Sequence, residues 1–137
     1  MTKLASIKFL ILFLFASDAY GQKVKYKDIW GLLNTKQYEA AEPFLKKYLQ
    51  ETTDNPNAYL YMGIIFQEKS LKDDVLKSTR QAIADMDSAV FNYDKAYKTI
   101  TEREVKKNSE LYQAYNRRDL RTGEFGVKLS DIQFDLE

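Results

Sequence analysis

The chain of 137 residues contains no cysteine and no histidine. Without thiols it can form neither disulfide bonds nor a thiolate nucleophile, and it has no site for lipid attachment to an exported cysteine. Without imidazoles it lacks histidine proton relays and the usual zinc ligands. Its closely spaced carboxylates lie one or two residues apart, as in Asp73/Asp74, Asp85/Asp87 and Glu102/Glu104, so on a helix they do not face each other. We therefore expect no catalytic residues, no metal site, no cofactor and no enzymatic activity.

Glycine and proline are scarce, with five and two residues. Good helix formers run in long uninterrupted tracts, so strands joined by tight turns are not expected. Hydrophobic residues make up 45% of the chain and charged residues 30%, a balance that favours one globular domain over a disordered tail. The composition predicts an all-α fold.

The first residues, MTKLASIKFLILFLFASDAYGQ, combine two lysines with an apolar run from Phe9 to Ala16 and then small residues suited to a signal peptidase. Because a bilayer core needs about 20 apolar residues, this run is too short for a permanent membrane span. We expect a cleavable export signal over residues 1–21, with cleavage after Gly21 preferred to cleavage after Ala19. Its removal also removes Lys3, Lys8 and Asp18 and leaves a formally neutral chain. A nucleic-acid partner is therefore not expected, since phosphate binding needs a surplus of positive charge.

Apolar residues at three- and four-residue steps predict helices over Tyr26–Asn34 and about Gln37–Thr52. A third helix should follow Asn55, whose side chain can cap it, with Pro56 in its first turn, and should end near Lys69.

Three further helix starts are predicted from capping-box-like pairs. Ser70 with Asp73 predicts a long fourth helix over about residues 71–100, and Thr101 with Glu104 predicts a fifth helix over about residues 102–120. Ser130 with Gln133 predicts a sixth helix at the end of the sequence. Because that helix would start where the sequence stops, there are two alternatives: its last residues fray, or residues 22–137 are the N-terminal part of a longer protein. We favour the second.

The long predicted helix carries apolar residues at seven-residue spacing. One column is Leu76, Ile83, Val90 and Tyr97, and the next is Thr79, Met86, Tyr93 and Ile100. A third column consists of Ala82, Ala89 and Ala96, and charged residues on the other flank are Arg80, Asp87 and Asp94. Since small side chains allow close approach, the alanines favour packing within one chain and a monomer. The alternative is a coiled-coil dimer through the Leu76–Ile100 seam.

One stretch has a fixed order of large, large, small and aromatic side chains: Tyr59, Met62, Gly63 and Phe66. This order resembles the first helix of a tetratricopeptide (TPR) repeat. Upstream, Ala41 and Leu45 have the spacing of the family's second helix, and Pro56 closes that unit. The same second-helix positions recur downstream at Ala89, Tyr93 and Ala96. We expect these nine residues to pack repeat helices against each other.

Ala89 follows Gly63 by 26 residues, whereas about a dozen separate these positions in an ordinary repeat. The surplus corresponds to about four helical turns, so we expect the second helix to have grown backwards to Leu71. The resemblance then implies antiparallel helix pairs of the TPR-like α-solenoid type, with one elongated helix. A third repeat around Tyr112 and Tyr115 matches only weakly.

In the TPR family the first helix of each repeat lines a concave groove, and this would bring Leu60, Ile64 and Gln67 towards a protein or peptide ligand. The resemblance therefore implies an exported scaffold for protein–protein interaction. The export signal with a following Gln resembles those of secreted Bacteroidetes proteins, which implies a periplasmic or outer-membrane location. A second cluster, Arg117, Arg118 and Arg121, could hold an acidic partner, but we expect it to be the cationic end of the fifth helix.

Overall fold

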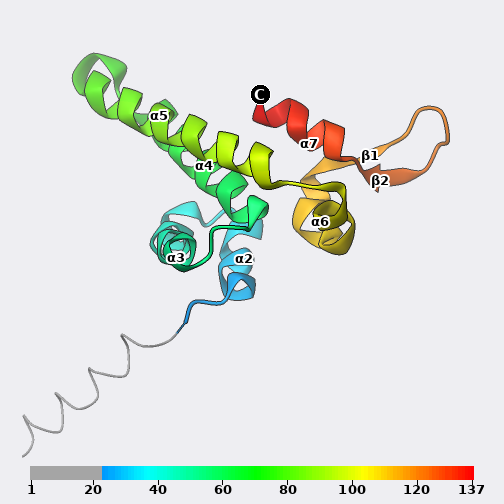
Figure 1. The fold of residues 1–137 in the computed structure, drawn as a ribbon. Coiled ribbons are helices and arrows are strands. Elements are labelled where there is room, and N and C mark those ends of the chain that lie inside the picture. The colour runs from blue at the N-terminus through cyan, green and yellow to red at the C-terminus, as the bar shows by residue number, and fades with distance from the viewer. Residues whose placement is uncertain (1–22) are drawn as a thin grey trace, which may run out of the picture.

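The computed structural model describes residues 23–137, so the predicted export signal lies outside the described residues. Figure 1 shows a mostly helical chain with one small hairpin, and the all-α prediction is confirmed. The elements in order are α2 (Tyr26–Asn34), α3 (Tyr38–Glu51), α4 (Pro56–Lys72), α5 (Val75–Thr99), α6 (Glu102–Lys107), the 3-10 helix η2 (Ser109–Tyr115), β1 (Asn116–Arg118), β2 (Phe125–Val127) and α7 (Leu129–Leu136).

The first three described helices begin and end close to their predicted positions because short-range interactions define them. The Asn55 side chain accepts a hydrogen bond from the Ala58 amide at 3.1 Å, and Pro56 occupies the first position of α4. Lys36 turns the chain between α2 and α3 with a positive φ of 57°. This left-handed residue ends α2 in the way that glycine commonly does.

The predicted start of the long helix at Leu71 is wrong. Helix α4 continues to Lys72, and Ser70 is buried within it, where its hydroxyl donates to the Ala82 carbonyl at 2.8 Å. The cap of α5 is Asp74, whose carboxylate accepts from the Leu76 amide. Helix α4 thus extends past Ser70 to Lys72, and α5 begins at Val75. The surplus residues therefore lengthen both helices of the pair. The first turn of α5 is irregular at Ser78, which has φ −128° and ψ 33°.

The predicted fifth helix is also wrong beyond its first two turns. Thr101 caps α6 through its side chain, as expected, by accepting from the Glu104 amide. The helix stops at Asn108, where φ is −121° and ψ is 41°, and the chain continues as η2 and then as a hairpin of β1 and β2. Strands were not expected, because the turn that joins them depends on side-chain contacts described below.

The last helix, α7, begins one residue before the predicted Ser130, and no side chain caps it. Its Ile132 and Leu136 are buried against the C-terminal half of α5. An eight-residue helix is marginal on its own, so this packing is what stabilises it.

Two hydrophobic cores share helix α4. The first joins α2, α3 and one side of α4 through Ile29, Leu33, Ala41, Leu45, Ala58, Met62 and Ile65. The second joins the other side of α4 to the C-terminal elements through Tyr59, Leu60, Ala96, Ile100, Val105, Tyr112, Ile132 and Leu136. Figure 1 shows the consequence: α4 and α5 lie side by side as an antiparallel pair, and one end of this pair projects beyond both cores.

Among residues 23–137, no helix has the length and apolar character needed to cross a bilayer.

Candidate binding surface

The alanine column of α5 faces α4, as predicted. Ala82, Ala89 and Ala96 are all buried, and the α4–α5 contact is the most extensive between any two elements of the described chain. Side chains of this size allow two helix backbones to approach closely. The α4–α5 pair is therefore closely packed along the alanine column.

Gly63 is the point of closest approach on α4. A Cβ at this position would overlap the ring of Tyr93 on α5, so only glycine fits without displacing that ring. The Tyr93 hydroxyl then donates to Gln67 Oε1 at 2.6 Å. Burial raises the pKa of Tyr93 to about 12, with smaller contributions from Tyr115 and nearby acidic groups, so the phenol stays protonated at neutral pH.

The other residues of the TPR-like pattern divide between the two cores. Ala41, Leu45 and Met62 are buried in the first core, and Tyr59 and Ala96 are buried in the second. Phe66 is half-buried, with the ammonium groups of Lys46 and Lys69 each 5.3 Å from its ring centre. These positions therefore pack helices together, although such packing does not by itself establish a TPR repeat.

The three predicted groove residues have different surroundings. Leu60 is only 4% exposed, because Val105, Tyr112 and α7 cover it, so it is not available on the surface. Ile64 is partly buried against the same core. Gln67 is exposed and holds the Tyr93 hydroxyl. The structure brings Ile64 and Gln67 to the open flank of the α4–α5 pair, and a binding role for them stays a prediction.

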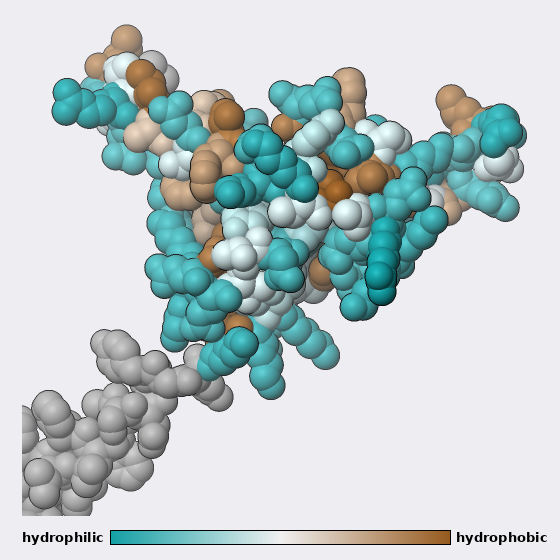
Figure 2. All heavy atoms as spheres, viewed as in Figure 1, coloured by the Kyte–Doolittle hydropathy of each residue, from teal (hydrophilic) through white to brown (hydrophobic). Residues whose placement is uncertain are grey.

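A row of apolar side chains lies exposed along α5, and we call it the α5 strip. Ile83 is 57% exposed and Val90 is 59% exposed, and Figure 2 shows apolar atoms gathered along the projecting α4–α5 pair. The members of the strip are Leu76, Ile83, Met86, Val90 and Tyr97. Contiguous apolar surface of this kind is typical of protein interaction sites.

The strip is exposed because of helix geometry. Consecutive residues in an α-helix point about 100° apart, so Ile83 faces well away from Ala82, and Val90 well away from Ala89. Helix α4 covers only the alanine side. The sequence places the alanine column beside the Leu76–Ile100 seam, and the structure covers the alanines while leaving Ile83 and Val90 exposed. The sequence contained one signal for this exposed surface. The long helix has an alanine column and a column of larger apolar residues, and only one neighbouring helix is available to cover them.

Three charged residues line the outer flank of the strip. Asp94 is paired with Lys98 on the same helix at 2.7 Å. Arg80 and Asp87 form no ion pair within residues 23–137. The outer flank thus offers one positive and two negative side chains to a partner that covers the strip.

The arginine cluster lies on the β1–β2 hairpin, and its predicted position at a helix C-terminus is wrong. Asp119 shapes the turn by accepting hydrogen bonds from the amides of Arg121 and Thr122, and it also binds the Lys128 ammonium at 2.5 Å. These interactions, led by Lys128, lower the pKa of Asp119 to about 2. At the tip, Leu120 is fully exposed. The exposed residues of the cluster are Arg117, Arg118 and Arg121.

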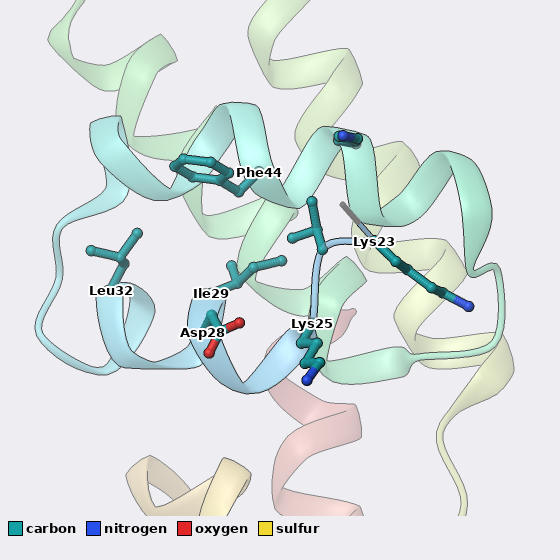
Figure 3. Close-up of a pocket in the computed structure, with 8 residues that line it drawn as sticks. Lys23, Lys25, Asp28, Ile29, Leu32 and Phe44 are labelled. Atoms are coloured by element: carbon teal, nitrogen blue, oxygen red, sulfur yellow. The ribbon is translucent and has the colours of Figure 1, made fainter. Parts of the chain in front are cut away.

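A pocket of about 590 Å³ lies between α2 and α3. Figure 3 shows Phe44 of α3 facing Ile29 and Leu32 of α2, with Asp28 and the lysines 23 and 25 at the edge. Its wall is completed by residues 23–25, the first that the structure describes. We assign no role to this pocket.

Within residues 23–137, no group of three or more acidic side chains comes together in a way that could hold a metal ion. Comparisons of the chain with family models, curated proteins and solved structures find no match. The surfaces described above are therefore the basis for assigning a function.

Proposed function

We propose that this protein is an exported helical scaffold that binds a protein segment through the α5 strip. The observation that carries the proposal is the exposure of four large apolar side chains at helical spacing on one flank of a closely packed helix pair: Ile83, Met86, Val90 and Tyr97. Leu76 is also exposed and precedes the irregular turn at Ser78. Side chains at this spacing suit a partner helix, which would lay its own apolar face along α5. The TPR-like packing of α4 against α5 supports the same class of function, because TPR proteins are interaction scaffolds.

The proposed binding surface differs from the groove implied by the resemblance. The proposed surface includes Ile64 and Gln67 at its α4 edge, together with Ile83, Met86 and Val90 of α5. It excludes Leu60, which is buried in the second core. An apolar face on a rigid scaffold favours binding, because few side chains of the scaffold must lose freedom when the partner docks. A location in the cell envelope is part of this proposal and rests on the predicted export signal.

Two kinds of helix could cover the strip: a segment of another protein, or α5 of a second copy of this chain. The second kind is the coiled-coil alternative, and the exposure of Leu76, Ile83, Val90 and Tyr97 favours it specifically. Were these side chains buried within the chain, no coiled coil could form from them.

The test compares Ile83→Glu with Ala84→Glu. Both substitutions add one negative charge at an exposed position of α5, and only Ile83 belongs to the strip. Neither should change the free energy of unfolding by more than about 0.5 kcal/mol, since surface changes of this kind are usually small. Proteins captured from the envelope by the wild-type chain are identified, purified and titrated against both variants by calorimetry.

We expect Ile83→Glu to weaken binding at least tenfold and Ala84→Glu to leave the affinity within twofold of wild type. Equal affinities for the wild type and both variants would refute the strip as the binding site. Self-association is measured in the same samples by analytical ultracentrifugation, so that binding to a second copy is distinguished from binding to another protein.

A further inference from the structure

The α5 strip and its charged flank have a near-twofold pattern along the helix. Ile83 and Val90 are equally spaced about the midpoint between residues 86 and 87, and so are Leu76 and Tyr97. Ile83 and Val90, which lie on either side of Met86, have almost equal exposure, whereas Leu76 is 94% exposed and Tyr97 is 38% exposed. A pattern that reads similarly in both directions fits a second copy running antiparallel, because a twofold axis requires one surface to match itself.

The flanking charges are symmetric about a point half a residue further along the helix. Arg80 and Asp94 also lie at equal distances from residue 87, on the outer flank of the strip. In an antiparallel pair each Arg80 would face the Asp94 of the other copy. Arg80 lacks an ion pair within residues 23–137. In the dimer, Arg80 of each copy would pair with Asp94 of the other, which gives two ion pairs. In a parallel pair, the charged flank of one copy would instead lie opposite the alanine column of the other copy, and α4 already covers that column.

From these observations, and resting on the proposed function of the strip, we infer that the occupant of the strip is α5 of a second copy, paired antiparallel with its centre near residue 87. Ile83 then packs beside Val90 of the other copy, and Leu76 beside Tyr97. Met86 lies close to its own counterpart at the axis. The two Asp87 carboxylates meet there as well, and this like-charge contact opposes association.

The absence of cysteine makes disulfide cross-linking a direct test. The variants Met86→Cys, Ile83→Cys and Val90→Cys are made in the full chain, purified from cells that express it, and oxidised alone or as mixtures. Met86→Cys should form a covalent dimer alone. Ile83→Cys should form one only when mixed with Val90→Cys. The two residues at position 83 in the dimer lie about 10 Å apart along the helix direction, and a disulfide needs Cα atoms within about 7 Å.

Charge exchange provides a second measurement. Arg80→Asp should weaken the dimer about tenfold in sedimentation equilibrium, and Asp94→Arg should do the same. The double variant should recover most of the loss. Asp87→Asn should tighten the dimer by about twofold or more. Arg103→Asp, an equivalent charge reversal on α6, should have no effect on association.

Several outcomes would overturn the inference. A chain that stays monomeric at a concentration on the order of 200 µM would refute self-pairing. Cross-linking of Ile83→Cys with itself would show a parallel pair, and failure of the double charge variant to recover would refute the register. Loss of partner binding in Ile83→Glu together with a monomeric chain would retain the proposed function and reject only the second copy as occupant.

Discussion

The substitution Gly63→Ala is the most direct test of the packing between α4 and α5. The added methyl group would overlap the Tyr93 ring, which is held between the two helices and bonded to Gln67. Overpacking of this kind costs about 1–3 kcal/mol. Displacing the ring also breaks the Tyr93–Gln67 hydrogen bond, which is worth about 0.5 kcal/mol at an exposed site.

Alanine has a compensating advantage, because it favours the helix over glycine by about 1 kcal/mol. The net effect should therefore be a loss of about 1–2 kcal/mol in the free energy of unfolding, or a fall of about 4–8 °C in Tm for a chain of this size. Urea denaturation followed by circular dichroism at 222 nm measures it. Because Tyr93 is the cause, Gly63→Ala should become neutral or stabilising in a Tyr93→Ala background.

Gly31→Ala is the matched control. Gly31 is also within a helix, but a Cβ there would have no atom within 4 Å, so only the propensity gain of about 1 kcal/mol applies. The two alanine variants should thus shift stability in opposite directions. If Gly63→Ala stabilised the protein as much as Gly31→Ala does, α5 would not pack against α4 at this point and the position of the strip would lose its basis.

Two further predictions concern polar contacts. Asn57 of α4 is buried, accepts from the Tyr26 hydroxyl at 2.5 Å and donates to the Leu111 carbonyl at 2.9 Å. Asn57→Ala should therefore lower stability by about 2–4 kcal/mol in urea denaturation, because it leaves both groups unpaired. An unchanged midpoint would contradict these two hydrogen bonds. The pKa of Asp119 is lowered from 3.8 to about 2, so its contact with Lys128 contributes stability that is present above about pH 4 and is lost as the pH falls towards 2. The protection factors of the hairpin amides against hydrogen exchange should therefore fall over this range in the wild type and vary less with pH in Asp119→Asn, which lacks the titration.

Short-range signals predicted the N-terminal half of the fold well. The bounds of α2 and the Asn55 cap of α4 depend on residues within a few positions, which is why they can be read from sequence. Ser70 was misread for the opposite reason. Its hydroxyl has the chemistry of a cap, but its partner is the Ala82 carbonyl, twelve residues away on the facing helix.

The candidate surface was predicted only in part. Periodicity correctly placed Ala89 and Ala96 on a packed face and correctly found the heptad column of Ile83 and Val90. It did not show that one column is covered and the other exposed, because both are apolar. Leu60 could not be excluded from the groove by its sequence position, since the residues that bury it lie more than forty positions later.

By itself, the sequence determined that the chain is helical, where most helices begin, and that one long helix carries alanine and large apolar columns side by side. These features follow from local propensity, capping and periodicity, which act over a few residues. Only the tertiary structure decided which column meets α4, how the last thirty residues cover Leu60, and where the hairpin turns. Those outcomes depend on competition among distant surfaces for burial, and no local pattern contains the result of that competition.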